Sequence, residues 1–225
     1  MFSGFTDRTF EYYMAIRMNN NRAFFEANRG WYEGDVKRPM LELIEALAPT
    51  ALEIDAQLDA RPARCLARAM RDVRRLHGQP AYRDYSFFKF RRLGEDRYTA
   101  LGLFFDLSDD GASYGCGIYE KNVPLMNAFR RAILTEPERV LKLTGRAERA
   151  FTLYPDTVKR MVVPESVPDA LRRFYPMRRF YMQREIQDFA QIKSPALVDE
   201  IVRGYGELKG LYQFIQALTP IDDRS

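Results

Sequence analysis

Residues 97–120, RYTALGLFFDLSDDGASYGCGIYE, decide the fold of this chain. Two runs rich in apolar and aromatic residues, 97–108 and 112–120, flank Asp109-Asp110-Gly111. An Asp-Gly pair between two such runs is typical of a β-hairpin turn. The preceding run YSFFKFRR, residues 85–92, predicts a strand that leads into the hairpin. The centre of the chain is therefore expected to form an antiparallel sheet.

The segments on either side of this hairpin have helical periodicity. Before the hairpin, helices are predicted at 9–18, with Thr6 or Asp7 as cap, at 22–32, with Asn20 or Asn21 as cap, and from Pro39 onward. After the hairpin, helices are predicted from Pro124, at 137–143, at 167–175 and from Ser194-Pro195. Further strands are predicted at 60–72, ARPARCLARAMRD, and at 178–186. No repeat or linker interrupts the chain. We expect an α+β fold in which residues 1–225 form a single domain, with a mostly antiparallel central sheet and helices from both chain ends packed on it.

The composition is that of a soluble globular protein. Of 225 residues, 46% are hydrophobic and 29% are charged, so a core of ordinary size is expected. The only cysteines are Cys65 and Cys116, too few for a disulfide framework, and both are predicted to be buried thiols. Charged residues interrupt the apolar N-terminus, and no apolar run approaches the roughly 20 residues that span a bilayer. We expect a cytoplasmic protein with no membrane attachment.

The chain is mildly basic, with a formal net charge of +4, and arginine supplies 28 of its 35 basic residues. Arginine binds carboxylates and phosphates through paired hydrogen bonds, so this bias is compatible with anion recognition. Arg-for-Lys exchange from GC-rich coding explains the same bias without any function. The 31 interspersed acidic residues argue against nucleic acid as a partner.

Several landmarks occur in an order that resembles a known family. They are FSGFTDRTFEYY, NNNRAFFEANRGWY, MRDVRRLHGQPAYRDY, YGCGIYEKNVPLMNAFRRAI, LYPDTVKRMVVPE and LRRFYPMRRFY. Together they are similar to the bacterial and fungal family called domain of unknown function 2461, over nearly the whole chain. The resemblance implies an α+β domain of this length and no established activity, cofactor or partner.

One family motif is altered in this chain. Family members typically carry a run like RD-x-RFS-x-(D/N)K-x-PYK, and Arg71, Asp72, Arg74 and Tyr82 match it. An aromatic residue, a serine and a lysine are replaced by Arg75, Leu76 and Gln79, and Arg83 replaces a second lysine. If the family site uses that serine and lysine, this protein binds something different or has lost the activity.

The altered motif is the first candidate site. Asp72 could hold the Arg74 guanidinium in a bidentate pair and orient it toward an anion. The turn at 78–80 could return Tyr82 and Arg83 over the same region. The alternative is a salt bridge that pins a loop against the sheet.

The second candidate lies on the hairpin. Gly115, Gly117 and Tyr119 share one face of the predicted strand, because residues two apart point the same way. Bare backbone there would suit a ligand lying on the sheet, although a closely packed helix or the rings of Phe104 or Phe105 would explain the glycines equally well. Arg130, on the following helix, is a candidate to complete an anion pocket or is one of a solvent-facing pair.

Several kinds of chemistry find no support. A single histidine, His77, excludes multi-histidine metal sites and histidine-pair catalysis, and its Gly-flanked position indicates a surface residue. No nucleotide-binding loop or nucleophile elbow is present, so no cofactor is predicted. A metal bound by Asp106, Asp109 and Asp110 is conceivable, but DLSDDG is explained more simply by the hairpin turn.

The leading hypothesis is a pocket on the sheet that binds a small anionic or polar ligand. Its predicted lining is Arg71, Arg74, Tyr82, Tyr119 and Arg130, with Asp72 or Glu120 as the carboxylate for any proton transfer. One alternative is a protein interaction module that uses surface aromatics such as Tyr12, Phe24, Tyr32 and Tyr212. Nucleic-acid binding is the other. The ligand, the reaction and the oligomeric state are left open by the sequence.

Overall fold

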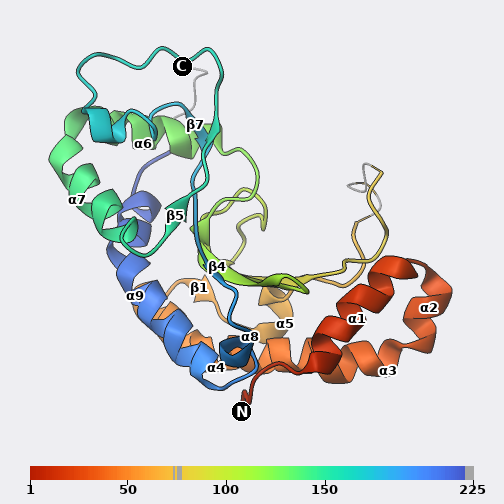
Figure 1. Cartoon of the computed structure of the whole chain (residues 1–225). Helices are drawn as coiled ribbons and strands as arrows, with labels where there is room; N and C mark the ends of the chain where they lie inside the picture. Colours follow the sequence, from red (N-terminus) through yellow and green to blue (C-terminus); the bar gives the residue numbers. More distant parts are fainter. Residues whose placement is uncertain (73, 75–77, 221–225) are drawn as a thin grey trace.

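A computed structural model of the chain describes residues 1–72, 74 and 78–220. It confirms the α+β class (Figure 1). Six strands form one antiparallel sheet in the order β1-β2-β3-β4-β8-β5, and β6 and β7 form a separate pair. The strands are β1 (Leu58–Asp59), β2 (Ser86–Arg92), β3 (Gly102–Ser108), β4 (Gly111–Gly117), β5 (Thr152–Leu153), β6 (Asp156–Thr157), β7 (Met177–Arg179) and β8 (Tyr181–Ile186).

The predicted hairpin is confirmed as β3 and β4, joined at Asp109-Asp110. Gly111 has a positive φ of 134°, and a Cβ atom there would lie 2.7 Å from the carbonyl oxygen of Ile186, so glycine is required. The strands are shorter than the apolar runs that predicted them. Residues 97–101 form a turn instead, because the Asp96 carboxylate accepts hydrogen bonds from the backbone N–H groups of Tyr98 and Thr99.

Two helices begin at asparagine caps, of which Asn21 was predicted and Asn122 was not. The side chain of Asn21 accepts a hydrogen bond from Phe24 N at 2.9 Å, and that of Asn122 accepts one from Leu125 N at 3.1 Å. The helices are α1 (Asp7–Met18), α2 (Arg22–Ala27), α3 (Arg29–Trp31), the π-helix η1 (Tyr32–Lys37), α4 (Arg38–Ile54), α5 (Pro62–Cys65), α6 (Val123–Thr135), α7 (Pro137–Ala147), the 3-10 helix η3 (Asp169–Leu171), α8 (Phe189–Ile192) and α9 (Ala196–Gln216). Among the described helices, none is long and apolar enough to cross a membrane.

The strand predicted at 60–72 is wrong. Pro62 opens the short helix α5, and the chain then runs irregularly along β2 with isolated bridges from Leu66 to Phe88 and from Met70 to Tyr82. Proline favours the first turn of a helix, and alanine-rich segments are poor strand formers, so a continuous ladder does not form here. This irregular segment becomes one wall of a groove described below.

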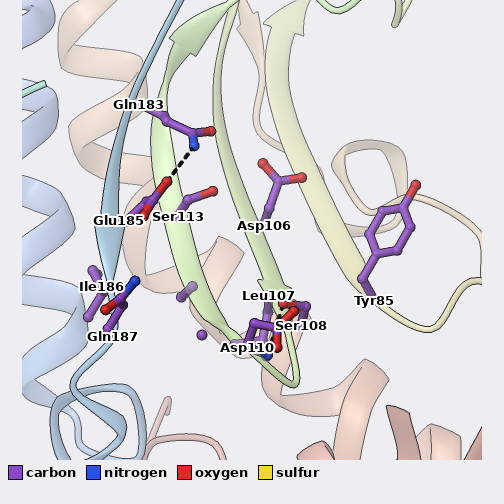
Figure 2. A pocket seen from close by; sticks show the side chains of 12 residues that line it. Tyr85, Asp106, Leu107, Ser108, Asp110, Ser113, Gln183, Glu185, Ile186 and Gln187 are labelled. Carbon is purple, nitrogen blue, oxygen red and sulfur yellow. Dashed lines mark hydrogen bonds between the residues drawn. The ribbon is translucent and has the colours of Figure 1, made fainter. Parts of the chain in front are cut away.

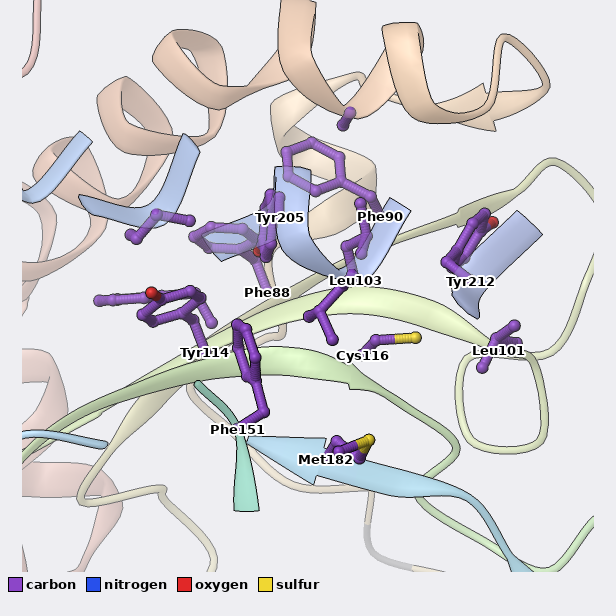
Figure 3. Close-up of a cluster of buried hydrophobic side chains, with 14 of the residues drawn as sticks. Phe88, Phe90, Leu101, Leu103, Tyr114, Cys116, Phe151, Met182, Tyr205 and Tyr212 are labelled. Carbon is purple, nitrogen blue, oxygen red and sulfur yellow. The ribbon is translucent and has the colours of Figure 1, made fainter. Parts of the chain in front are cut away.

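Helices α4 and α9 cover one face of the sheet (Figure 1). Alternate residues of the strands point into this layer, including Phe88, Phe90, Leu103, Tyr114 and Cys116, all of them buried (Figure 3). The Tyr114 hydroxyl donates to the Glu200 carboxylate of α9 at 2.9 Å. We call the opposite face, which carries Phe87, Asp106 and Ser113, the groove face.

Candidate functional site

One row of side chains crosses four strands on the groove face, and three of the four are polar. Phe87 of β2 pairs with Asp106 of β3, Asp106 pairs with Ser113 of β4, and Ser113 pairs with Glu185 of β8. Residues paired across an antiparallel ladder project on the same side. Two hollows lie over this face, one on each side of Phe87, and we call them the arginine groove and the Asp106 cleft.

The arginine groove lies between β2 and the irregular segment that follows α5. Its volume is about 720 Å³. Among the described residues that line it, seven are arginines and one, Asp72, is acidic. The arginines are Arg64, Arg68, Arg71, Arg74, Arg83, Arg91 and Arg97, and the aromatic lining residues are Phe87 and Tyr98.

Backbone carbonyl groups, not carboxylates, hold several of these arginines. Arg97 donates to the carbonyl oxygen of Arg64 at 2.7 Å, and Arg91 donates to the carbonyl of Glu95 at 3.1 Å. Arg83 donates to the carbonyl of Arg68 at 2.6 Å and lies 5.4 Å from the ring centre of Phe87. Carbonyl groups orient a guanidinium without neutralising its charge, so the positive charge of the groove persists.

Five arginines of the groove have no carboxylate partner in the described part of the chain: Arg64, Arg68, Arg83, Arg91 and Arg97. Nε of Arg83 is buried and has no described hydrogen-bond partner. Burial, together with the nearby charge of Arg91, lowers the pKa of Arg97. Since desolvated like charges repel one another, an anion in the groove would lower the energy of the folded protein.

The altered family motif lies at the groove, and its residues are held in different ways. Arg74 makes a bidentate pair with Asp72, at 3.0 and 2.7 Å, and its side chain is 85% exposed. Arg71 is nearly buried and donates to the carbonyls of Pro80 and Tyr82, at 2.8 and 2.7 Å. Arg71 therefore braces the loop, whereas Arg74 reaches into solvent. Arg75 and His77 lie outside the described residues.

Two other predicted residues point away from the groove. Tyr82 is buried and stacks on Phe25 of α2 with ring centres 4.6 Å apart. Arg130 is also nearly buried, and it donates to the carbonyls of Tyr175 and Met177, at 2.8 and 2.6 Å. Arg130 thus ties α6 to the segment at β7, and neither side chain lines the groove.

The glycines of β4 have close neighbours in β8. A Cβ atom on Gly115 would overlap the carbonyl oxygen of Met182, and one on Gly117 would lie 2.6 Å from a ring carbon of Tyr181. Phe104, which pairs with Gly115, stacks on Tyr181 with ring centres 4.6 Å apart. Close strand packing and covering aromatic rings therefore account for both glycines.

The Asp106 cleft lies next to the hairpin end of the groove face (Figure 2). Its volume is about 310 Å³. Acids, amides and hydroxyls dominate its lining, which includes Tyr85, Asp106, Ser108, Asp110, Ser113, Gln183, Glu185 and Gln187. Asp109, from the same turn, instead pairs with Arg17 of α1.

Asp106 is an under-satisfied carboxylate. Its Oδ2 atom is buried and has no hydrogen-bond partner among the described residues. Among the same residues, its Oδ1 atom accepts one hydrogen bond, from the Tyr119 hydroxyl, at 3.5 Å. Burial raises the pKa of Asp106 to about 7, although Tyr119 and the charge of Lys89 oppose the rise. A buried acid that titrates near neutrality beside a cleft is typical of functional sites.

Lys89, the neighbour of Asp106 on this face, is fully buried. Its Nζ atom donates to the carbonyls of Ala100 and Arg97, at 2.6 and 3.2 Å, and lies 4.8 Å from the ring centre of Tyr119. Burial lowers the pKa of Lys89 to about 7. Lys89 thus lies against the Tyr119 ring, on the same side of the sheet as Asp106, and is only partly protonated near neutral pH.

Several residues of the groove and the cleft were not predicted from the sequence. Arg64, Arg68 and Arg97 were not candidates. Arg64 lies in the short helix α5, Arg68 in the irregular segment after it and Arg97 in the turn before β3, so no single periodic pattern joins them. Asp106 was considered only as a turn residue or metal ligand. The strand alternation that places Asp106, between Phe105 and Leu107, on the face opposite the core was the available signal.

The aromatic residues proposed for a protein interface are mostly internal. Tyr12, Tyr32 and Tyr212 are buried, and Phe24 is half-buried. The Tyr212 hydroxyl, for example, donates to Asp55 at 3.0 Å. These four rings therefore do not form an exposed aromatic patch.

These features define an α+β protein whose antiparallel sheet carries helices on one face and an arginine-lined groove on the other. The chain belongs to the family described as "Conserved hypothetical protein (DUF2461)", whose model matches residues 8–214. Comparison with curated proteins and with solved structures finds no match.

Proposed function

We propose that the arginine groove binds a small anionic ligand of the phosphate or carboxylate class. The observation that carries this proposal is the excess of charge: five arginines of the groove lack a carboxylate partner in the described part of the chain. Salt bridges occupy arginines elsewhere, such as Arg17 and Arg92. A bound anion therefore stabilises the protein more in this groove than at arginines that are already paired with carboxylates.

The dimensions of the groove favour a small molecule. Its volume of about 720 Å³ falls in the range of roughly 300–1,000 Å³ that small-molecule sites occupy. Guanidinium groups fixed by backbone carbonyls lose little freedom on binding, so they are suited to bidentate contact with phosphate or carboxylate oxygens. Phe87 and Tyr98 add apolar surface for the remainder of a ligand.

Removing Arg64 and Arg68 together should abolish much of this binding. Neither side chain makes a described hydrogen bond or ion pair, so the double variant Arg64→Ala/Arg68→Ala should fold with unchanged stability. Charge-assisted hydrogen bonds contribute about 1.5–3 kcal/mol each. We therefore expect the dissociation constant for pyrophosphate, measured by isothermal titration calorimetry, to rise at least tenfold.

Lys159→Ala/Arg160→Ala is the matched control, because both residues are exposed and outside the groove lining and this double variant also removes two positive charges. The control should bind pyrophosphate as the wild type does. Equal weakening in both variants would show that only net charge matters. Absence of pyrophosphate, phosphate and dicarboxylate binding by the wild type would refute the proposed function.

A further inference from the structure

We propose that the ligand is a phosphorylated polyol, such as a sugar phosphate, whose phosphate lies in the arginine groove and whose hydroxyl groups are bound in the Asp106 cleft. This inference rests on the proposed function and extends it to a substrate class. It assigns Asp106 as a specificity-determining residue that accepts hydrogen bonds from the ligand.

The two hollows are adjacent. Phe87 lines the arginine groove and pairs directly with Asp106, which lines the cleft. Tyr85 of the cleft stacks on Phe87, with ring centres 6.1 Å apart, and Arg71 of the groove lies 5.5 Å from the centre of the Tyr85 ring. The proposed ligand therefore extends over the stacked rings of Tyr85 and Phe87, which lie between the groove and the cleft.

Asp106 has unused hydrogen-bonding capacity. A carboxylate accepts about four hydrogen bonds. The described protein supplies one, from Tyr119, at 3.5 Å, and leaves Oδ2 without a partner. The χ2 torsion of an aspartate has a broad energy minimum, so a small rotation of the carboxyl group turns the unpaired Oδ2 atom toward the cleft that Asp106 lines.

The neighbours of Asp106 supply the complementary groups for hydroxyl recognition. Ser113 has no described side-chain hydrogen bond. The Gln183 amide donates to Glu185 at 3.3 Å, and the Tyr154 hydroxyl donates to the same carboxylate at 2.7 Å, so Glu185 is fixed at the edge of the cleft (Figure 2). Sugar hydroxyls both donate and accept hydrogen bonds, which matches a lining that mixes carboxylate, amide and hydroxyl groups.

The charges around Asp106 are mixed. Arg71 contacts the ring of Tyr85, which lines the cleft, whereas the carboxylates of Asp110 and Glu185 line the same cleft. A neutral hydroxyl group is only weakly affected by such a mixture of charges, and it is the partner that the proposal assigns to Asp106.

The experiment compares inorganic phosphate, ribose 5-phosphate and ribose by isothermal titration calorimetry. Wild type should bind ribose 5-phosphate at least tenfold more tightly than inorganic phosphate. A single hydrogen bond to a charged group is enough to increase affinity tenfold. Asp106→Ala should lose this advantage and keep its affinity for inorganic phosphate. Asp106→Asn is a second variant of nearly unchanged shape, and Asp199→Ala, on the exposed first turn of α9, is the matched control.

The possible outcomes separate this inference from the proposed function. If wild type binds inorganic phosphate and ribose 5-phosphate equally, or if the advantage survives in both Asp106 variants, the hydroxyl site is refuted and the anion groove stands. If neither phosphate compound binds, this inference is refuted, and the proposed function is refuted as well when pyrophosphate and dicarboxylates also fail to bind. Loss of the advantage in Asp106→Ala with retention in Asp199→Ala supports the assignment.

Discussion

Replacing Asp106 by Asn should stabilise the folded protein above pH 7 by roughly 2–4 kcal/mol. Burial raises the pKa of Asp106 from 3.8 to about 7, a change that corresponds to at most about 4 kcal/mol. The folded protein therefore retains this proton up to about pH 7, whereas the unfolded chain releases it near pH 4. Asn has the same shape and never carries the charge, so it avoids the cost of ionisation.

The sign of this effect follows from proton linkage. The favourable contribution of protonated Asp106 is complete below pH 3.8 and is lost as the pH rises through about 7. Wild type and Asp106→Asn should therefore be equally stable near pH 4. The stability difference should grow between pH 4 and pH 7 and stay constant above that.

Urea unfolding at several pH values measures this difference directly, and a melting-temperature gain of roughly 4–15 °C is expected at pH 8. Asp199→Asn is the control, since this carboxylate is exposed. A variant that is less stable than wild type at pH 8 would show that Asp106 makes a favourable ionic contact in the folded state. A stabilising substitution at a site residue is typical of positions retained for function at the expense of stability.

Replacing Gly204 by Ala should destabilise the protein by about 1–3 kcal/mol, although alanine is the better helix former. Gly204 lies in α9 where a Cβ atom would overlap the ring and hydroxyl of Tyr114. Tyr114 is fully buried and hydrogen-bonded to Glu200, so the ring has no space into which it can move. Overpacking of a core costs about this much, and it outweighs the helix propensity gained.

Gly206→Ala is a matched control within the same helix. Gly206 is exposed, and nothing lies within 4 Å of the added Cβ atom. Alanine there should stabilise the protein by roughly 0.5–1 kcal/mol through helix propensity alone. Thermal unfolding of both variants, followed by circular dichroism, provides the test. Equal stabilisation by the two substitutions would contradict the close packing of α9 on β4.

Local patterns were enough to predict most of the secondary structure. Asp109-Asp110-Gly111 predicted the hairpin, Asn21 predicted the start of α2, and Pro124 predicted the start of α6. Each of these signals acts within a few residues of its own position, through a positive φ angle, a side-chain cap or a fixed φ. The strand predicted at 60–72 was wrong because Pro62 opens the short helix α5 and the alanine-rich segment after it forms only isolated bridges, to Phe88 and Tyr82.

Only part of the candidate site could be predicted from local sequence patterns. The Asp72–Arg74 pair is two residues apart, and its geometry follows from local chain stiffness. By contrast, Arg97 reaches the carbonyl of Arg64 over 33 positions, and Asp106 meets Phe87 only through strand pairing. Neither contact corresponds to a periodic pattern in the sequence from which it could be predicted.

The sequence by itself determined the family, through the order of its motifs along the chain. It also determined the α+β class and the central hairpin, because apolar periodicity, turn residues and caps act over short ranges of chain. The tertiary structure alone decided which arginines share a groove. It also decided that Arg71 and Arg130 hold the loop and α6 in place, and that Asp106 is buried without a strong hydrogen-bond partner. Charge and burial are properties of a three-dimensional neighbourhood. A guanidinium or carboxyl group has the same chemistry everywhere in the sequence, and its role is set by the groups that folding brings within a few ångströms.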